Sequence, residues 1–177
     1  MTAGLNPQNP SDPLRRYTDI VVGVADIKSA SGEENVLVTY ALGSCLGITV
    51  YDSRRRIGGM LHAMLPDSRQ HASTSAQLRI AMFLDTGMTA LLAELRKLGA
   101  GERGLECKVF GGSQVLGADK FFRIGDRNVA AFQELSSQLG LRVGVWETGG
   151  QVNRTIKFYL ESGQVSVRTP SQPLFWR

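Results

Sequence analysis

Residues 45 to 51 read Cys45-Leu46-Gly47-Ile48-Thr49-Val50-Tyr51, a stretch in which aliphatic residues occupy every second position. This period of two is the pattern of a β-strand. A turn with three successive arginines follows, and residues 58–65 then resume as a second strand that Pro66 ends. Two strands joined by a short turn predict an antiparallel hairpin. The first part of the fold is therefore expected to be rich in strands.

Further strands and two helices are predicted around this hairpin. The other β-rich runs are residues 21–25, 36–40, 105–110, 142–146, 156–160 and 165–168. From Ser75 to Leu98 the apolar residues recur at helical spacing, and Gly99 suits the end of a helix. A second helix is predicted with Asp126 as its cap and Gly140 as its stop.

The order of these elements predicts the fold class. The chain runs from strands through a helix, one strand and a second helix to more strands, which indicates an α+β fold with two main helices. At 177 residues one domain is expected, over residues 17–168. Residues 1–16 are polar and rich in proline, so we expect a disordered arm, and residues 169–177 are expected to form a loose tail.

Composition excludes several classes of protein. No apolar stretch approaches the roughly 18 residues of a membrane span and no export signal is visible, so we expect no membrane insertion. Two cysteines are too few for a disulfide framework and suit the reducing cytoplasm. The net charge is +4, but the basic residues are scattered and the run Arg54-Arg55-Arg56 falls in a turn, so no nucleic-acid partner is expected.

Cys45 and His62 are the candidates for catalysis. Cys45 begins the first strand of the hairpin and His62 lies in the second, and hairpin partners face each other at about 5 Å. A thiolate is a nucleophile, and an imidazole in reach can take the thiol proton and later protonate a leaving group. The structural alternative is that Cys45 is a small buried apolar residue and His62 a hydrogen-bonded core residue.

Glycine and serine residues beside these candidates could shape a substrate site. Gly43 and Ser44 allow a sharp turn before Cys45 and leave backbone N–H groups to bind a developing oxyanion. Gly59 would remove bulk beside the histidine strand. No histidines or cysteines have the spacing of a zinc site and no phosphate-binding loop is present, so we expect no metal and no cofactor.

Three other residues have structural interpretations. Cys107 lies in a β-rich run and is expected to pack in the core. His71 follows Pro66 in a polar segment and is expected to face solvent. Asp85 falls on or beside the apolar stripe of the first helix, where we expect a rim position or a local hydrogen bond.

Four ordered blocks of sequence resemble the CheD family of chemoreceptor glutamine deamidases. They are Leu42-Gly43-Ser44-Cys45, Gly58-Gly59-Met60-Leu61-His62-Ala63-Met64-Leu65-Pro66, Lys108-Val109-Phe110-Gly111-Gly112 and Ile124-Gly125-Asp126-Arg127-Asn128. The resemblance spans roughly residues 17–168. It implies a β-sandwich-like core of mixed strands flanked by helices, similar to deamidating bacterial toxins.

The resemblance also implies an activity. Family members convert selected glutamine side chains of methyl-accepting chemotaxis receptors to glutamate and release ammonia, and receptor methyl-ester hydrolysis is a related reaction. Cys45 would be the nucleophile that forms a thioester, and His62 the base. Thr39 falls at the family's third catalytic position and would orient the imidazole, although β-propensity alone also explains a threonine there.

Partners follow from the same resemblance. Receptors are the expected substrates, CheC phosphatase is an expected partner, and we expect a monomer. Two alternatives stay open at this point: a non-enzymatic module that docks a receptor or CheC, and a cysteine amidase or peptidase with another substrate. Thiol reactivity near neutral pH would separate an enzyme from a module, and substrate identity would separate the two enzymes.

Overall fold

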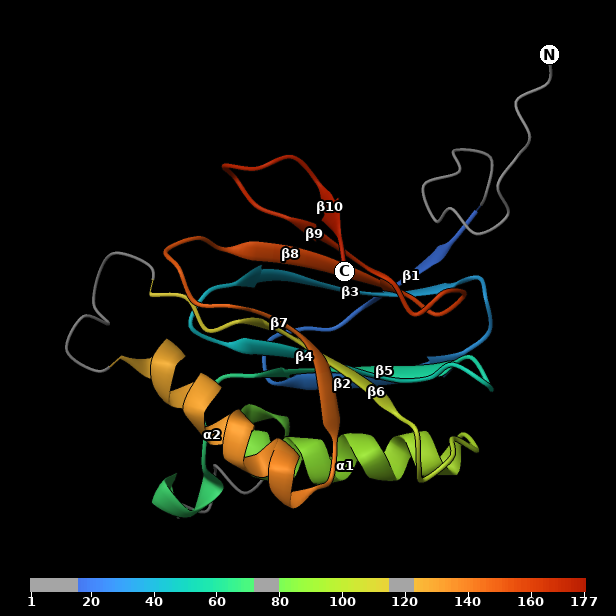
Figure 1. Cartoon of the computed structure of the whole chain (residues 1–177), viewed down its shortest axis with the longest axis horizontal. Helices are drawn as coiled ribbons and strands as arrows, with labels where there is room; N and C mark the ends of the chain where they lie inside the picture. Colours follow the sequence, from blue (N-terminus) through green and yellow to red (C-terminus); the bar gives the residue numbers. More distant parts are fainter. Residues whose placement is uncertain (1–15, 72–79, 115–122) are drawn as a thin grey trace.

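The computed structural model describes residues 16–71, 80–114 and 123–177. Within this part the chain forms three layers (Figure 1): a pair of helices, a central sheet, and a second sheet stacked on the other face of the first. Each sheet mixes parallel and antiparallel pairs, so the α+β prediction with two main helices is confirmed. None of the described helices is long and apolar enough to cross a membrane.

The central sheet has the strand order β2-β5-β4-β6-β7. Its strands are β2 (Asp26–Ser31), β4 (Leu46–Asp52), β5 (Ile57–Ala63), β6 (Glu106–Gly111) and β7 (Arg142–Thr148). β4 and β5 are the predicted antiparallel hairpin, and they are flanked on both sides by other strands. The hairpin therefore lies in the interior of the sheet.

The second sheet has the strand order β1-β3-β8-β9-β10. Its strands are β1 (Thr18–Val21), β3 (Asn35–Leu42), β8 (Arg154–Tyr159), β9 (Val165–Arg168) and β10 (Phe175–Trp176). β1 pairs in parallel with β3, and the remaining pairs are antiparallel.

Alternate residues of the hairpin belong to two different cores. Leu46, Ile48 and Val50 pack in the layer between the central sheet and the helices α1 (Leu84–Lys97) and α2 (Ile124–Gln138). Tyr51 and Met60 pack in the layer between the two sheets. The alternation in the sequence is thus real, but every residue of β4 and β5 is buried because both faces of the hairpin are covered.

A β-bulge bends β3 between Thr39 and Leu42. Within it Ala41 has φ 55°, in the left-handed region that few residues other than glycine adopt. Thr39 and Leu42 are both fully buried although they are three positions apart, whereas Tyr40 between them is 50% exposed. The extra residue of the bulge allows both buried side chains to face the inter-sheet layer while the chain turns toward Cys45.

Several boundaries differ from the sequence predictions. β2 is not predicted from the sequence, because Asp26-Ile27-Lys28-Ser29-Ala30-Ser31 has the mixed composition of a strand at the edge of a sheet. The first helix begins at Leu84 rather than at Ser75: residues 80–82 form a 3₁₀ turn, and residues 72–79 lie outside the described part. The predicted arm also lies outside it, apart from Arg16.

Asp126 does not cap the second helix. α2 begins at Ile124, so Asp126 lies in its first turn. There its carboxylate accepts hydrogen bonds from Arg123 Nε at 2.8 Å and from Gln114 Nε2 at 2.5 Å. The carboxylate is still near the positive end of the helix, where negative charge is favourable.

The tail from residue 169 ends in an ordered strand rather than a loose segment. β10 pairs with β9, and Val165 and Arg177 exchange two backbone hydrogen bonds of 2.9 Å. Arg177 also forms an ion pair with Glu147 at 2.8 Å. A two-residue strand has no period to detect in a sequence, and its partner strand lies across a turn, so the sequence carries no signal for β10.

Candidate active site

His62 lies near the end of β5 and faces the inter-sheet layer, where it meets Thr39 of β3. The two side chains contact each other through Thr39 Oγ1 and His62 Nδ1, 2.8 Å apart. Thr39 Oγ1 also donates a hydrogen bond of 2.7 Å to the carbonyl of Val22. Both side chains are buried, with exposed fractions of 0% for Thr39 and 1% for His62. The two sheets thus each contribute one member of this pair.

These hydrogen bonds determine which nitrogen of His62 carries the proton. The Thr39 hydroxyl has one hydrogen, and the Val22 carbonyl can only accept it. Oγ1 must therefore accept from Nδ1–H, which leaves the lone pair of the neutral imidazole on Nε2. Nε2 is buried and has no hydrogen-bond partner among the described residues. The imidazole is therefore oriented as a base.

Cys45 lies one diagonal step from His62 in the central sheet. Gly47 is directly opposite His62, and Cys45 precedes Gly47 by two residues. Diagonal neighbours on one face of an antiparallel pair are about 7 Å apart at Cα, within reach of a thiol and an imidazole ring. Cys45 packs against the inter-sheet core, the same layer that His62 faces, and its side chain is half-buried.

Burial keeps His62 neutral. Removal from water lowers the pKa of His62 to about 4, and the Asp26 carboxylate opposes this by raising it. Asp26 lies directly opposite His62 on the neighbouring strand β2. Its carboxylate also forms an ion pair with Lys28 at 2.9 Å. The imidazole is therefore an unprotonated base at neutral pH, with one carboxylate beside it.

Hydrogen bonds hold the segment Gly43–Cys45 from its carbonyl side. The Gly43 carbonyl accepts from Ser113 N–H and the Cys45 carbonyl from Gly112 N–H, each at 2.8 Å. The Ser44 carbonyl accepts from the side chain of Asn128 at 2.9 Å. No partner is found within the described residues for the backbone N–H groups of Gly43 and Ser44. These two N–H groups could bind an oxyanion.

Glycine is required where β6 ends beside the Cys45 segment. Gly111 has φ 101°, and a Cβ at this position would lie 2.2 Å from the carbonyl oxygen of Cys45. A Cβ at Gly125, in the first turn of α2, would lie 2.5 Å from the carbonyl oxygen of Gly112. The end of β6 can therefore approach Cys45 only because Gly111 lacks a side chain. The start of α2 can approach the end of β6 only because Gly125 lacks one.

The structure does not bring Gly59 to the other candidates. A Cβ at Gly59 would meet Leu91 and Leu95 of α1, so this position belongs to the layer between sheet and helices, on the opposite face from His62. Gly59 permits close packing of α1, which is a structural role. It is not part of the site.

Cys107, the other cysteine, lies in the layer between the central sheet and the helices. Cys107 is 1% exposed within the core beneath the helices, and burial raises the pKa of its thiol to about 12. The prediction that Cys107 packs in the core is confirmed. His71 ends a short 3₁₀ helix, Ser68–His71, but its side chain lies outside what the structure describes.

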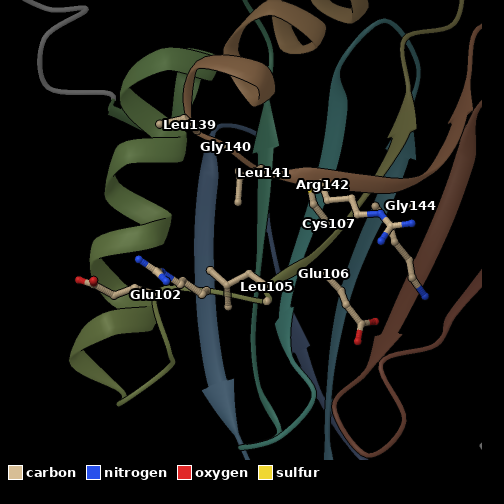
Figure 2. A pocket seen from close by; sticks show the side chains of 12 residues that line it. Glu102, Leu105, Glu106, Cys107, Leu139, Gly140, Leu141, Arg142 and Gly144 are labelled. Atoms are coloured by element: carbon tan, nitrogen blue, oxygen red, sulfur yellow. The ribbon is translucent and has the colours of Figure 1, made fainter.

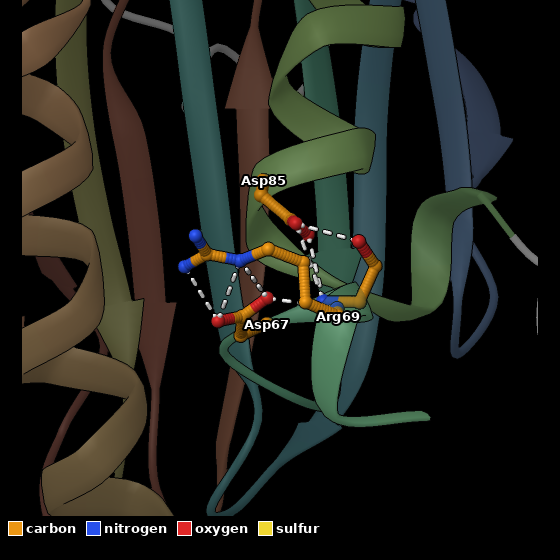
Figure 3. A network of polar contacts seen from close by, with 4 residues as sticks. Asp67, Arg69 and Asp85 are labelled. Atoms are coloured by element: carbon orange, nitrogen blue, oxygen red, sulfur yellow. Dashed lines mark hydrogen bonds and ion pairs between the residues drawn. The ribbon is translucent and has the colours of Figure 1, made fainter. Parts of the chain in front are cut away.

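Asp85 fixes the segment that follows the His62 strand. Its carboxylate accepts hydrogen bonds from Ser68 Oγ at 2.7 Å and from Ser68 N–H at 3.2 Å. Figure 3 shows Asp85 beside the Asp67–Arg69 ion pair, whose closest atoms are 2.8 Å apart. The Asp85 carboxylate thus has hydrogen-bond partners, but they lie 17 residues earlier in the chain rather than nearby, and they tie the segment after β5 to the start of α1.

A cavity of about 520 Å³ lies at the other end of β6. Figure 2 shows that its lining comes from the start of β6, the end of α2 and the start of β7, including Glu106, Leu141 and Gly144. Glu106 is about 16 Å from Gly111 along the strand. This cavity contains none of the predicted site residues. In residues 16–71, 80–114 and 123–177 no group of His, Cys, Asp or Glu side chains is arranged to hold a metal ion.

Two residues of this region are not found by the sequence reasoning. Asp26 belongs to a strand that is not predicted, so its position opposite His62 has no signal in the chain. Asn128 does have a signal: it is four residues before buried Phe132, so a polar side chain occupies the buried stripe of an amphipathic helix. Such a residue needs hydrogen-bond partners, and its partners here are Ser44 and Met64.

Comparison with known proteins gives one family. The family described as "CheD chemotactic sensory transduction" matches residues 64–169. A protein of Desulforamulus reducens named "Probable chemoreceptor glutamine deamidase CheD" is 41% identical over 159 residues, which cover 88% of this chain and 93% of the relative. A Syntrophus aciditrophicus protein named "Probable chemoreceptor glutamine deamidase CheD 1" is 35% identical, covering 88% of this chain and 97% of the relative. A Pyrococcus abyssi protein with the same name as the first is 40% identical, and the match covers 85% of this chain and 91% of the relative.

Proposed function

Because this chain belongs to the CheD family, we propose that it is a chemoreceptor glutamine deamidase. It hydrolyses the side-chain amide of selected glutamines in chemotaxis receptors to glutamate and ammonia. The observation that carries the proposal is the contact between Thr39 and His62, which leaves the lone pair of Nε2 available on the face of the sheet that Cys45 shares. A core histidine with a purely structural role would have both ring nitrogens satisfied.

The first half of the reaction forms a thioester. His62 Nε2 takes the proton of the Cys45 thiol, and the sulfur attacks the amide carbon of the receptor glutamine. The backbone N–H groups of Gly43 and Ser44 hold the negative charge that develops on the amide oxygen. His62 then gives its proton to the amide nitrogen, the C–N bond breaks and ammonia leaves.

The second half releases glutamate. A water molecule takes the place of ammonia, His62 Nε2 removes one of its protons, and the oxygen attacks the thioester carbon. The C–S bond breaks, Cys45 regains its proton from His62, and the receptor carries a glutamate. Proton transfer by a positioned base contributes roughly 10²- to 10⁴-fold to such reactions. The same thioester would form from a glutamate methyl ester with methanol as leaving group, so ester hydrolysis is part of the proposal.

The roles of Thr39 and Asp26 follow from their contacts. Thr39 Oγ1 holds Nδ1–H and so keeps Nε2 unprotonated and the ring in one orientation. When Nε2 takes a proton the ring becomes positive, and the Asp26 carboxylate opposite it favours that form. Both residues act through His62 and do not touch the substrate.

The test uses the purified protein and the cytoplasmic fragment of a chemotaxis receptor. Ammonia release is measured in solution, and the change from amide to acid is located by peptide mass spectrometry. A parallel sample of receptor methyl ester tests ester hydrolysis. Cys45→Ala should remove turnover, whereas Cys107→Ala serves as a matched cysteine control and should retain it, because Cys107 lies on the other face of the sheet.

Two results would overturn the proposal. Conversion by Cys45→Ala at the rate of the unmodified protein would show that this thiol is not the nucleophile. Absence of conversion by the unmodified protein across several receptors would favour a non-enzymatic module or another amide substrate. Binding of the receptor fragment, measured in the same samples, separates these two.

A further inference from the structure

Asn128 connects the two segments that carry the nucleophile and the base. Its side chain is fully buried at the first turns of α2. The amide nitrogen Nδ2 donates one hydrogen bond to the carbonyl of Ser44 and a second to the carbonyl of Met64, each 2.9 Å long. Ser44 directly precedes Cys45, and Met64 follows His62 by two residues.

Both hydrogens of the Asn128 amide are used in this bridge. Among the natural side chains of this size only asparagine presents two neutral donors from one atom, and the isosteric aspartate presents none when ionised. Asn128 Oδ1 is buried and has no hydrogen-bond partner in the described part of the chain. An unsatisfied buried acceptor costs about 1–3 kcal/mol, so stability alone is a poor reason for asparagine at this position.

Asn128 also completes a row of donors along the Cys45 segment. The carbonyls of Gly43 and Cys45 accept from backbone N–H groups of residues 113 and 112, and Asn128 supplies the donor for the carbonyl between them. With three successive carbonyls held, the peptide planes of the segment cannot rotate. The Ser44 N–H group shares its peptide plane with the Gly43 carbonyl, so this donor keeps a fixed direction.

The helix that carries Asn128 is itself held close to this row. Gly125, one turn earlier, packs against the backbone of Gly112 and Ser113 at a distance that no Cβ would allow. The amide is therefore mounted on a rigid element rather than on a loop, which is the condition for precise placement of a reacting group.

We infer that Asn128 is a positioning residue of the reaction: its bridge sets the separation of Cys45 and His62. The inference rests on the proposed deamidase function. It adds a residue on α2 to a site that otherwise consists of residues on strands and on the turn before β4.

The substitution Asn128→Asp tests the bridge with almost no change in size. Ionised aspartate cannot donate to either carbonyl, so the Cys45 segment and the end of β5 should separate. Misplacement of reacting groups costs on the order of 10²-fold, and we expect kcat for receptor deamidation to fall by roughly that factor while KM changes less than twofold. The rate of Cys45 alkylation by iodoacetamide at neutral pH, followed on the Cys45 peptide by mass spectrometry, should fall in parallel.

Asn35→Asp is the matched control. Asn35 Nδ2 also donates to a backbone carbonyl, that of Ser31 at 2.8 Å, but at the start of β3 and near the surface. The same chemical change there should leave kcat and the alkylation rate unchanged. Circular dichroism and thermal melting establish that each variant is folded before its rates are compared.

Asn128→Ser keeps the test decisive if the aspartate variant does not fold. Serine is small and neutral and retains one donor, so we expect a folded protein with a kcat loss between those of Asn128→Asp and the unmodified protein. Folded variants whose kcat and alkylation rate stay within twofold of the unmodified protein would overturn the inference. Alkylation needs no receptor, so failure of the inference is distinguishable from failure of the deamidase proposal.

Discussion

At the scale of single residues, the proposed reaction depends on the protonation state of His62. Thr39 determines which ring nitrogen carries the proton, burial lowers the pKa of the ring to about 4, and Asp26 raises it. Thr39 belongs to β3 and Asp26 to β2, and both lie beside His62 of β5. The neutral imidazole with an available Nε2 therefore depends on the packing of β2, β3 and β5 around His62. Two predictions test this dependence.

The first prediction concerns pH. The base must be neutral, so deamidation should decline on the acid side near pH 4 rather than near 6.5, the ordinary pKa of histidine. Burial alone would raise the pKa of Asp26, but hydrogen bonds from Lys28, Gly23 and Ile27 hold it below its ordinary value of 3.8. Asp26 therefore ionises more readily than an ordinary aspartate. The other strands beside His62 present neutral Thr39 and Gly47, and the thiol of Cys45 lies diagonally across from it.

Asp26→Asn removes the charge that raises the pKa of His62, so the acid decline should move to lower pH. The imidazolium formed during attack loses the same support, and kcat at neutral pH should fall. The measurement is the pH profile of kcat/KM for the receptor fragment, with Asp26→Glu as the variant that keeps the charge. An acid decline at the same pH in Asp26→Asn and the unmodified protein would contradict the assigned role.

The second prediction concerns Thr39. Thr39→Ser keeps the hydroxyl that accepts from Nδ1–H and donates to the Val22 carbonyl, so activity should stay within a few fold. Thr39→Val has nearly the same shape but no hydroxyl, so the imidazole loses its orientation and kcat should fall by about 10²-fold. The measurement is the steady-state kcat of the two folded variants. Equal activity of the valine and serine variants would show that Thr39 matters only for its β-propensity.

At the scale of elements, the site exists where strand ends converge. The bulge in β3 turns the chain toward Cys45, and the end of β6 and the start of α2 close around the Cys45 segment. These approaches are backbone to backbone, and the glycines at positions 111 and 125 make them possible. The glycine-containing blocks of the sequence that resemble the CheD family thus have a physical explanation in packing around the Cys45 segment.

The third prediction tests this packing through Gly111. In Gly111→Ala a Cβ would have to fit 2.2 Å from the Cys45 carbonyl oxygen, at a residue with φ 101°. Left-handed backbone and overpacking each cost about 1–3 kcal/mol, so the free energy of unfolding should fall by about 3 kcal/mol or more, and the displaced Cys45 segment should lose activity. Urea denaturation and the deamidation assay measure the two effects.

Gly144→Ala provides the comparison for that experiment. Gly144 is also a glycine of the central sheet, but nothing lies within 4 Å of a Cβ built there and its φ is not positive. We expect its free energy of unfolding to change by less than about 0.5 kcal/mol. A loss in Gly111→Ala no larger than in Gly144→Ala would refute the close-approach argument.

At the scale of the whole molecule, the two sheets and the helices serve different purposes. The helices and one face of the central sheet form an apolar layer, while Thr39, His62 and Cys45 lie in the layer between the two sheets. Figure 1 shows the second sheet lying over the central sheet on the side away from the helices. The pair Thr39 and His62 spans the two sheets, so anything that shifts one sheet on the other should affect the site.

The fourth prediction concerns the end of the second sheet. A chain that ends at Leu174 loses β10, the two backbone hydrogen bonds with Val165, and the contact between the rings of Trp176 and Tyr159. We expect the free energy of unfolding to fall by about 2–4 kcal/mol, from lost hydrogen bonds and apolar burial. Deamidation by the folded fraction should persist, because β10 is an edge strand and β8 and β9 lie between it and β3.

Arg177→Ala isolates one part of that effect. It removes the ion pair with Glu147 and the contact of the guanidinium with the Phe175 ring but keeps the backbone of β10. Exposed ion pairs contribute at most about 1 kcal/mol. Urea denaturation of both proteins separates strand pairing from charge. If the truncated chain were as stable as the unmodified protein, the tail would be loose in solution, as the sequence pattern suggests.

The sequence by itself determined the local features of this protein: the hairpin of β4 and β5, two amphipathic helices, the α+β class, and the position of Cys45 at the start of the hairpin with His62 in its second strand. Periodicity carries this information because it reflects which side chains share a face within one element. The tertiary structure alone decided which elements pack against one another. It placed Asp26 of an unpredicted edge strand opposite His62 and joined Thr39 to the imidazole across two sheets. It also placed Asn128 of α2 between the segments of Cys45 and His62 and turned Gly59 away toward α1. Contacts between residues far apart in the chain leave no period in a sequence, and so a site built from several strands and a helix appears only once they are packed.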